Sequence, residues 1–547
     1  MMQQYIEPQF RAALAALGVD FDGVIQFSVP RQEGHGHLAT NISMMLSKGL
    51  GKPPRVLAEE IVAALPASDL ISQVEIAGPG FINITFTDAV YHAMLRDLHG
   101  LGDDIGRSDV GRGRRVNVEY VSANPTGPLH AGHGRNCAVG DTVANLFAWN
   151  GYDVTREYYF NNAGNQMNKL GESIYVRVQH RLGNMDVGFP EDGYHGEYIH
   201  TVADLVVREF GEQLHGMSED DAKSLCRKQG EQWCFAAIQK TLSELNIHHD
   251  VYFNEDSLYG DGKVESTIQE LRQKGLVYEK DGATWFALTA LGNQQDKVIV
   301  KSTGEATYRL PDIAYHRDKL QRGFDVVIDI FGADHIATVP DVLAGVRALG
   351  FDTDRVRVVI HQMVTFVENG EVVKFSKRSG KSFTLDELID EVGADVVRFF
   401  FVMRAVGTHL EFDLGLAKEE GDKNPVFYLQ YAHARICSIL RKAAERGVTV
   451  DQGADLAALV HPREIELISM LSRMRANVER SCENLEPHSI AEYLRDLAGA
   501  YHNFYHDCRI LGAEGQLENA RLYLADVTRR AMRNGLLLLG VGTPERM

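Results

Sequence analysis

The segment from Arg115 to Asn150 constrains the fold of this chain most strongly, because it predicts a strand, a turn and a helix in direct succession. β-Forming residues alternate over 115–121, and a turn rich in Asn, Pro, Thr and Gly follows at 124–128. Over 132–150 apolar residues recur at helical spacing, and the segment closes on the stop signal Asn-Gly. The chain should therefore pass from strand to helix close to residue 130.

The same region repeats this alternation and predicts a parallel α/β sheet. Helical segments separate further predicted strands, which lie at 153–158, 325–331 and 356–364. Sheets of this kind place their ligand sites at the carboxyl ends of the strands. The polar stretch from about 183 to 262 interrupts the pattern. We expect it to be an insertion carrying helices, with 202–214 and 220–245 as the best candidates.

Two histidines, His130 and His133, lie where the predicted strand gives way to the predicted helix. A helix N-terminus carries partial positive charge and unpaired N–H groups, both of which suit a phosphate. Each imidazole can donate a hydrogen bond to a phosphoryl oxygen. Gly132 has no Cβ, so a flat ring such as adenine could lie against the backbone there. The alternative is a pair of surface or helix-capping histidines with no ligand.

A second stretch, KFSKRSGK, places four cations among small residues from Lys374 to Lys381. Such a loop can close over an anion, and Thr384–Glu387 beyond it has the pattern of a helix capping box. A charge run is more often a solvated surface loop, but this one occurs in a chain whose formal net charge is −19. We therefore predict that the two stretches together hold the triphosphate of ATP.

The two stretches resemble the signature motifs of class I aminoacyl-tRNA synthetases, which are usually written HIGH and KMSKS. His130-Ala131-Gly132-His133 matches the first motif, and Lys374-Phe375-Ser376-Lys377-Arg378 matches the second with Phe for Met and Arg for the final Ser. Their longer flanks, EYVSANPTGPLHAGHGRN and SKRSGKSFTLDELIDEVGADVVRFFF, resemble the arginyl-tRNA synthetase family. PRQEGHGHLATN, YAHARI and the terminal GVGTPERM do so too, so the resemblance covers nearly the whole chain.

The resemblance implies an ATP-dependent, AMP-forming ligase. Such an enzyme converts L-arginine to arginyl-AMP, releases pyrophosphate, and passes the arginyl group to the 3′-terminal ribose of tRNA(Arg), with Mg²⁺ bound to the ATP. The family generally activates arginine only when tRNA is present, and we expect the same behaviour here.

The resemblance also implies which residues act on ATP. The catalytic residues would be His130, His133, Lys374 and Lys377. The histidines would donate to phosphoryl oxygens, while Lys377, helped by Lys374, would follow the β- and γ-phosphates. Further ATP contacts would come from Gly132, Asp334 and His335, and which of the last two points inward is left open.

The family's arginine-binding positions fall on four residues of this chain, which are Ser122, Asn124, Tyr308 and Asp312. A planar guanidinium pairs bidentately with carboxylates, so Glu119 and Asp312 are the candidates for recognising the arginine side chain. Ser122 and Asn124 match positions that hold the backbone end of the substrate. Asp312 could instead be a plain helix cap, and Leu310-Pro311 departs from the Thr-Arg often found in the family.

We expect three domains with different roles. They are an appended α/β domain over 1–105, a class I Rossmann-like catalytic domain over 115–395 with its insertions, and an α-helical anticodon-binding domain over 418–547. In the family the first domain contacts the outer corner of the tRNA. Beyond about 396 the sequence predicts only helices, at about 425–447, 462–484, 488–511 and 515–539, which is the pattern of a bundle.

Aromatic and basic residues in the last domain are candidates for binding tRNA, because stacking rings and cations are how proteins read unpaired bases. The candidates are Tyr501, Tyr505, Arg529 and, by resemblance to the family's C-terminus, Met547. The alternative is that the aromatic residues belong to the core of the bundle.

Composition narrows the class of protein further. No apolar run approaches the roughly 20 residues needed to span a bilayer, and MMQQYIEPQF lacks the pattern of a signal peptide. Six scattered cysteines without a CxxC pair argue against disulfides and a structural metal, and favour a reducing cytoplasm. The acidity opposes non-specific nucleic-acid binding, so tRNA must meet local basic patches. We expect a monomer.

Three other functions were weighed against this one. A different class I synthetase would share both motifs, but Glu119 and Asp312 favour a cationic substrate. A non-catalytic tRNA-binding relative would not need His130, His133 and Lys377. A small-molecule nucleotidyltransferase would not need the helical C-terminal domain. Charging tRNA with each of the twenty amino acids in turn would decide among them.

Overall fold

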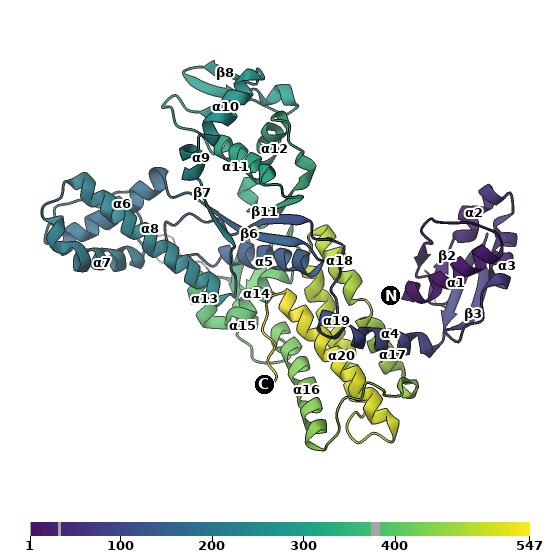
Figure 1. The fold of residues 1–547 in the computed structure, drawn as a ribbon. Coiled ribbons are helices and arrows are strands. Elements are labelled where there is room, and N and C mark those ends of the chain that lie inside the picture. The colour runs from purple at the N-terminus through teal and green to yellow at the C-terminus, as the bar shows by residue number, and fades with distance from the viewer. Residues whose placement is uncertain (1, 31–33, 374–382) are drawn as a thin grey trace.

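The computed structural model describes residues 2–30, 34–373 and 383–547, and it places a parallel sheet at the centre of the chain (Figure 1). The sheet contains β5 (Arg115–Glu119), β6 (Asp153–Phe160), β7 (Val251–Asn254), β11 (Val326–Gly332) and β12 (Val356–His361). Their order is β12-β11-β5-β6-β7 and every pairing is parallel. The predicted α/β class and its four strands are confirmed, and β7 is an additional edge strand.

The strand order reverses at β5, which fixes where a ligand can enter. The chain continues from β5 to β6 on one side, whereas β11 and β12 are added on the other. Connections leave in opposite directions at such a point and open a crevice at the carboxyl ends of the strands. Helix α5 (His133–Trp149) follows β5 and packs against β5, β6 and β11.

Two insertions interrupt this domain. The first contains α6 (Gly164–Arg181), α7 (Glu197–Leu214) and α8 (Glu219–Glu244), which share a small core of their own. The helices predicted at 202–214 and 220–245 are confirmed, but the insertion already begins with α6 rather than near 183. The second insertion contains α9 (Asp256–Gly260), α10 (Lys263–Gln273) and an antiparallel sheet of β8 (Val277–Lys280), β9 (Ala283–Phe286) and β10 (Lys297–Val300).

Helices α11 (Arg309–Gln321) and α12 (Val339–Ala348) then return the chain to the central sheet, one before β11 and one after it. Short 3-10 helices occur at η1 (Gly102–Asp104), η2 (Leu288–Leu291), η3 (Ala333–His335), η4 (Thr353–Arg355) and η6 (Leu456–Ala458).

A small second sheet follows β12 and corrects one expectation. It contains β13 (Val364–Glu368), β14 (Glu371–Val372) and β15 (Leu410–Asp413), and β15 runs parallel to β13. The chain beyond 396 is therefore not wholly helical, because Leu410 and Phe412 alternate with exposed and half-buried residues. Helices α13 (Leu385–Val392), α14 (Ala394–Val402) and α15 (Leu414–Ala417) surround this sheet, and the capping box predicted at Thr384–Glu387 is formed.

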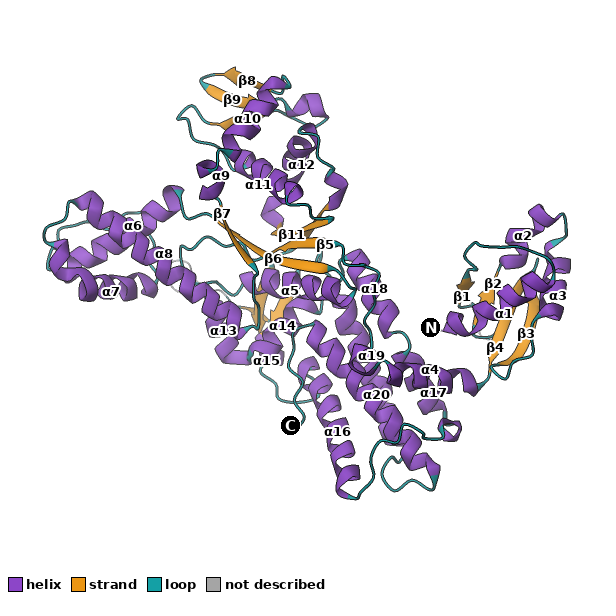
Figure 2. Cartoon of the chain, in the orientation of Figure 1, coloured by secondary structure: helices purple, strands orange, loops and turns teal. Residues whose placement is uncertain are grey.

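The N-terminal domain forms its own antiparallel sheet, separate from the central one (Figure 2). Its elements are α1 (Met2–Ala16), β1 (Phe27–Ser28), β2 (Leu38–Thr40), α2 (Ile42–Leu50), α3 (Pro54–Ala64), β3 (Ile71–Ala77) and β4 (Phe81–Phe86). The next helix, α4 (Asp88–Gly100), packs on the C-terminal bundle, where His92 Nε2 lies 2.8 Å from Leu459 O and His99 stacks on Tyr523.

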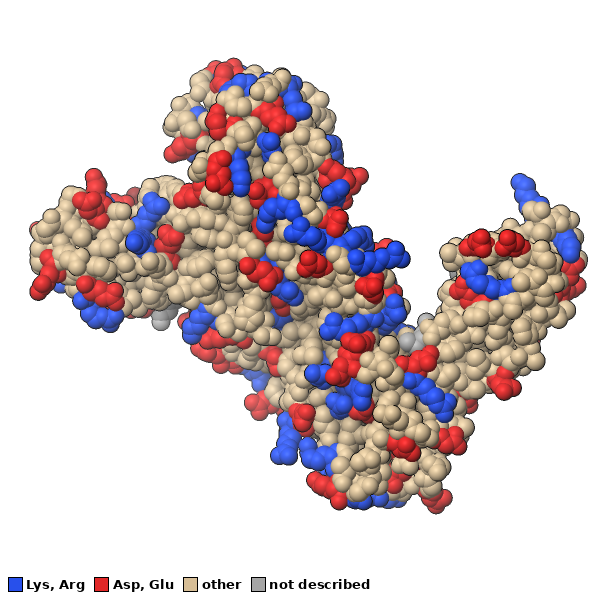
Figure 3. All heavy atoms as spheres, viewed as in Figure 1, with Lys and Arg blue, Asp and Glu red and all other residues tan. Residues whose placement is uncertain are grey.

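The C-terminal bundle contains α16 (Pro425–Glu445), α17 (Pro462–Leu471), α18 (Met474–Asn484), α19 (His488–Asp507) and α20 (Gln516–Leu538). The predicted bundle is confirmed, with the segment 462–484 divided into two helices. In the described part of the chain, none of the helices combines the length and apolar character that crossing a bilayer requires. Acidic and basic side chains are interspersed over the face seen in Figure 3.

One buried arginine joins the bundle to the catalytic domain. The Arg398 guanidinium on α14 donates to the carboxylate of Asp141 on α5, to Leu245 O after α8, and to Leu539 O after α20. The side chain is 1% exposed. Three segments that are distant in the sequence are therefore held by a single planar group.

Candidate active site

The two motif histidines lie at the start of α5, where the sequence predicted them. The His130 N–H donates to Nδ1 of His133 at 3.2 Å, and the Gly132 N–H donates to Nδ1 of His130 at 3.1 Å. Because both Nδ1 atoms accept, each neutral imidazole carries its proton on Nε2. The ring centroids are 3.8 Å apart. The two rings therefore lie together at a helix N-terminus, each with an Nδ1 atom that accepts a backbone N–H.

His133 is neutral in this setting. Burial lowers the pKa of the His133 ring to about 3, and His130 and His361 act in the same direction. A neutral ring with its proton on Nε2 remains a hydrogen-bond donor throughout the physiological pH range. Such a donor can stabilise charge that develops on a phosphoryl oxygen.

Gly132 lies directly beside the His130 ring. A Cβ at this position would lie 2.9 Å from Cε1 and 3.0 Å from Nδ1 of His130, so a side chain here would require that ring to shift. The contact between Gly132 and ATP stays a prediction.

Lys374 and Lys377 lie outside the described residues, but the chain that follows them is bonded to the histidine motif. The Ala131 N–H donates to Phe383 O at 2.9 Å, and the Leu385 N–H donates to Leu129 O at 2.8 Å. His130 and Thr384 face each other in an antiparallel bridge. The fold thus brings the C-terminal flank of the lysine stretch directly to the two histidines.

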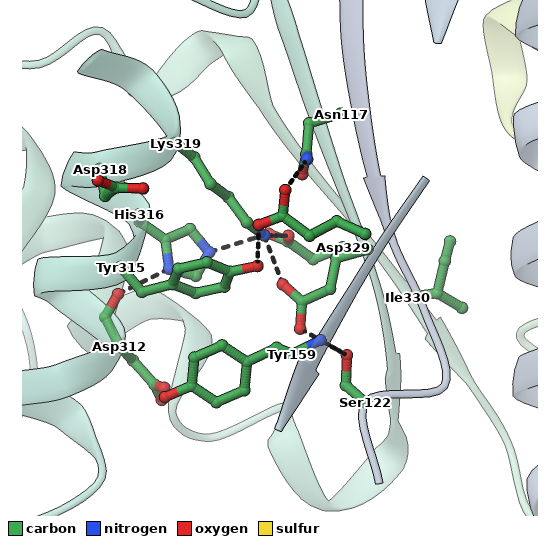
Figure 4. A network of polar contacts seen from close by, with 12 residues as sticks. Asn117, Ser122, Tyr159, Asp312, Tyr315, His316, Asp318, Lys319, Asp329 and Ile330 are labelled. Carbon is green, nitrogen blue, oxygen red and sulfur yellow. Dashed lines mark hydrogen bonds and ion pairs between the residues drawn. The ribbon is translucent and has the colours of Figure 1, made fainter. Parts of the chain in front are cut away.

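Carboxylates gather where β5 and β7 end and α11 begins. Glu119, the last residue of β5, is 3% exposed and accepts a hydrogen bond from Ser122 Oγ at 2.9 Å. Glu255 follows β7 and accepts a hydrogen bond from the Tyr159 hydroxyl at 2.6 Å. Asp312 lies in the first turn of α11 and faces the same region (Figure 4). These groups form the acid cluster of the site.

Burial and mutual repulsion disfavour the charged forms of the carboxylates in the acid cluster. The pKa of the Asp312 carboxyl is raised to about 7, mainly by burial and also by the nearby Glu119 and Glu255 carboxylates, while His316 and Lys319 act in the opposite direction. Burial also raises the pKa of Glu255. A cationic ligand would relieve this repulsion and favour the ionised form of Asp312.

Beneath the acid cluster lies a buried charge network on α11 and β11 (Figure 4). Lys319 Nζ contacts the Glu119 carboxylate and donates to Asp329 Oδ1 at 2.6 Å. His316 faces Asp329 Oδ2 through Nε2 at 3.0 Å and Asp312 O through Nδ1 at 2.8 Å. Both His316 nitrogens face acceptors, which favours the imidazolium form, and although burial lowers the pKa of the ring, Asp329 outweighs burial and raises it. The network fixes α11 against the central sheet.

The other predicted arginine contacts lie on segments that adjoin the acid cluster. Tyr308 is the residue before α11 and is 75% exposed. Asn124 is held by the protein itself, since its Nδ2 donates to Gln166 Oε1 and its Oδ1 accepts from the Asn161 N–H. Ser122 bridges Glu119 and the Tyr159 N–H. Glu119, Ser122, Asn124 and Asp312 therefore come from adjoining elements, although substrate contact by each stays a prediction.

Asp334 and His335 follow β11 at its carboxyl end, as predicted. The His335 ring stacks on Phe331 with centroids 4.9 Å apart. The Asp334 side chain is 84% exposed, whereas that of His335 is 49% exposed. His335 is thus the more enclosed of the two, and contact of either residue with ATP stays a prediction.

The predicted tRNA-binding residues of the bundle differ in their exposure and in their contacts. Tyr501 is fully buried, so it belongs to the core and is removed from the candidates. Arg529 is paired with Asp526 at 2.7 Å, one turn earlier on α20. Tyr505 and Met547 remain, because both line a groove of about 1150 Å³ together with Tyr431 and Arg435.

Sequence reasoning missed one member of the acid cluster and the residues that contact the cluster or lie in the network below it. They are Tyr159, Glu255, His316, Lys319 and Asp329. Two signals could have found part of this set. Asp329 is the only charged residue in the apolar strand VVIDIFG, and Asp312, His316 and Lys319 share one face of α11 at spacings of four and three.

Comparison with known proteins agrees with this geometry. Residues 4–86 match the family model described as the arginyl tRNA synthetase N terminal domain. Residues 102–398 match the model for tRNA synthetases class I (R), catalytic domain, and residues 429–547 match the DALR anticodon binding domain. The three models cover the three domains in the order predicted from the sequence.

Full-length relatives carry the same description. The chain is 48% identical to the arginine–tRNA ligase of Salinibacter ruber over 567 residues, covering 100% of both chains. It is also 48% identical to that of Desulfotalea psychrophila, over 96% of this chain and 95% of the relative. The fold matches the arginyl-tRNA synthetase structure of Thermus thermophilus with a TM-score of 0.73 at 22% identity, over 100% of both chains. The chain therefore belongs to the arginyl-tRNA synthetase family, whose members are class I aminoacyl-tRNA ligases.

Proposed function

We propose that the crevice between the histidine motif and the acid cluster activates L-arginine with ATP and transfers the arginyl group to tRNA(Arg). The observation that carries this proposal is the acid cluster itself. Glu119, Glu255 and Asp312 bring three carboxylates together at the strand ends, and the pKa of Asp312, which is raised mainly by burial, would be lowered by a bound cation. A guanidinium supplies that cation in a planar, bidentate form.

In the first step the arginine carboxylate attacks the α-phosphate and pyrophosphate leaves. The side chains have little covalent work to do, so catalysis depends on positioning and on neutralising the charge of the leaving pyrophosphate. His130 and His133, together with the N-terminus of α5, would take this role, and the support for it is their position at the start of that helix.

Lys377, with help from Lys374, would contact the β- and γ-phosphates. Both lysines lie outside the described residues, and the support for their role is the pairing of Phe383 and Thr384 with the histidine motif. Mg²⁺ is expected to enter with the phosphates of ATP, as part of the substrate.

The groove of the bundle is proposed to receive the anticodon region of the tRNA. The Arg435 guanidinium lies 4.4 Å from the centroid of the Tyr431 ring and 4.8 Å from that of Tyr505. Rings and guanidinium planes of this kind stack on unpaired bases, and Met547 lines the same groove. A monomeric cytoplasmic enzyme remains the expectation from sequence.

Arginine affinity should rise with pH up to about 7 and level off above it. The Asp312 carboxyl, whose pKa is raised to about 7, is largely protonated below that pH, and a guanidinium pairs with the ionised form. Binding must then release a proton, so the dissociation constant should increase about tenfold for each pH unit below 7. Calorimetric titration at several pH values tests this, and an affinity that does not change between pH 5.5 and 7 would contradict it.

Replacing Asp312 with asparagine should lower kcat/KM for arginine roughly 10- to 100-fold, because one hydrogen bond to a charged group contributes about 1.5–3 kcal/mol. The KM for ATP should change little. The assay is charging of tRNA(Arg) with each of the twenty amino acids. The matched control is Asp318→Asn on the same helix, where Asp318 pairs with Lys263 and Arg322.

The possible results distinguish an error in the proposed function from an error in the role assigned to Asp312. If the unaltered protein charges tRNA with an amino acid other than arginine, or with none, the proposed function is wrong. If it charges arginine and Asp312→Asn does so equally well, the function stands and the role of Asp312 is wrong.

A further inference from the structure

The chain makes an unusual turn directly after β5. Val121 and Ser122 have φ values of +69° and +44°, although neither is a glycine. The Ser122 N–H donates to Tyr120 O at 3.0 Å, which closes a three-residue turn around Val121. Left-handed backbone is a genuine outlier for a β-branched residue, and turns of this hand are strained. Something nearby must hold Val121 in this conformation.

Asn136 on α5 is the group that holds it. Its Oδ1 accepts a hydrogen bond from the Val121 N–H at 2.6 Å. Its Nδ2 donates to Ile330 O on β11 at 2.8 Å and lies 3.3 Å from Nε2 of His361 at the end of β12. The Asn136 side chain is 7% exposed. One carboxamide therefore clamps the carboxyl ends of three adjacent strands, one turn beyond the histidine motif.

The strained turn positions Ser122, which in turn orients the Glu119 carboxylate of the acid cluster. Ser122 Oγ donates to Glu119 Oε1 at 2.9 Å and accepts from the Tyr159 N–H at 3.1 Å. If Val121 relaxed to negative φ, Ser122 would move away from both partners. Glu119 would then keep its contact with Lys319 but lose the hydrogen bond that orients its other oxygen.

We propose that Asn136 is a positioning residue for arginine binding: its carboxamide keeps Val121 and Ser122 in the left-handed turn that aims Ser122 and Glu119 at the substrate. The proposal rests on the proposed function and goes beyond it, because Asn136 itself lies beneath the crevice. The proposal assigns Asn136 to arginine binding, whereas the histidines of the neighbouring motif are proposed to act on ATP.

The test compares four variants by calorimetric arginine binding and by tRNA charging. Asn136→Ala should weaken arginine binding tenfold or more, while the KM for ATP stays within about threefold. Adding Val121→Gly should recover most of the lost affinity, since glycine adopts φ +69° without strain. Val121→Gly alone should bind arginine as the unaltered protein does. Asn145→Ala, a control on the same helix whose amide reaches Asp141 and Leu538 O, should leave arginine affinity unchanged.

Several results would overturn the proposal. A purely structural role predicts that Asn136→Ala lowers the melting temperature without changing arginine affinity, and that Val121→Gly restores nothing. If Asn136→Ala does not fold, the comparison of Val121→Gly with the double variant decides, because equal arginine affinity in that pair is the expected result and a tenfold loss contradicts it. If the unaltered protein neither binds nor charges arginine, the proposed function fails instead.

Discussion

Replacing Lys319 with methionine should lower the free energy of unfolding by about 3–5 kcal/mol, the cost of removing one partner from a buried ion pair. The Lys319 ammonium is fully buried between the carboxylates of Glu119 and Asp329 and lies 4.3 Å from the centroid of the Tyr315 ring. Methionine fills a similar volume but leaves the Glu119 carboxylate without its cationic partner and Asp329 with His316 alone. The lost solvation of these carboxylates, no longer offset by the ammonium, is the source of the loss.

The pH dependence of the Lys319→Met variant gives a second signature. Burial alone would raise the pKa of Asp329, but Lys319 and His316 outweigh it and hold that pKa well below its usual range. In the native protein this contributes stability that is present above the unfolded pKa of an aspartate and is lost on acidification. Without Lys319 the pKa of Asp329 should rise, so the deficit in stability should shrink as the pH is lowered from 7 to 5.

Denaturant unfolding at the two pH values measures both effects. The control is Lys301→Met, because Lys301 pairs with Glu305 on the surface and such pairs contribute about 0–1 kcal/mol. A loss below about 1 kcal/mol for Lys319→Met would mean that the network does not anchor α11 to the sheet.

Replacing His133 with alanine should lower the rate of arginyl-adenylate formation on the order of 10²–10³-fold, the usual effect of removing one preorganised donor. The reason is the loss of the Nε2–H group that we propose donates to the phosphoryl oxygens. Arginine affinity should change little, because the acid cluster lies on other elements. Since the pKa of His133 is lowered to about 3 by burial, the pH profile of the rate should show no ionisation of this ring between pH 6 and 8.

Pyrophosphate exchange in the presence of tRNA(Arg) measures this rate. His133→Gln keeps a side-chain N–H donor and should recover part of it. The control is His180→Ala, because His180 lies on α6 in the first insertion and contacts Val187 O. An exchange rate within threefold of the unaltered protein for His133→Ala would remove the histidine motif from the mechanism.

The elements near the histidine motif could be predicted from sequence because their signals are local. The alternation of 115–121, the turn that follows and the helical spacing beyond 132 each depend on neighbouring residues. The capping box at Thr384 was found for the same reason. Strand β15 was missed because it is four residues long and derives its stability from pairing with β13.

The acid cluster was predicted only in part, because pairing across the chain leaves no local pattern. Glu119 and Lys319 are 200 residues apart in sequence, and nothing near either residue indicates the other. Tyr501 and Tyr505 are both tyrosines and lie four residues apart on α19. Tyr501 is nevertheless buried, whereas Tyr505 lines the groove of the bundle. Helical periodicity gives the face of a helix but not the neighbour that covers it.

The buried Arg398 gives the molecule a stiff mechanical link. Helix α5 begins at the histidine motif. Asp141 in the middle of this helix accepts a hydrogen bond from the same guanidinium that donates to Leu539 O at the end of α20. Packed protein interiors transmit displacement rather than absorb it. A displacement of the end of α20 would therefore be transmitted through this guanidinium to α5, rather than being absorbed within the bundle.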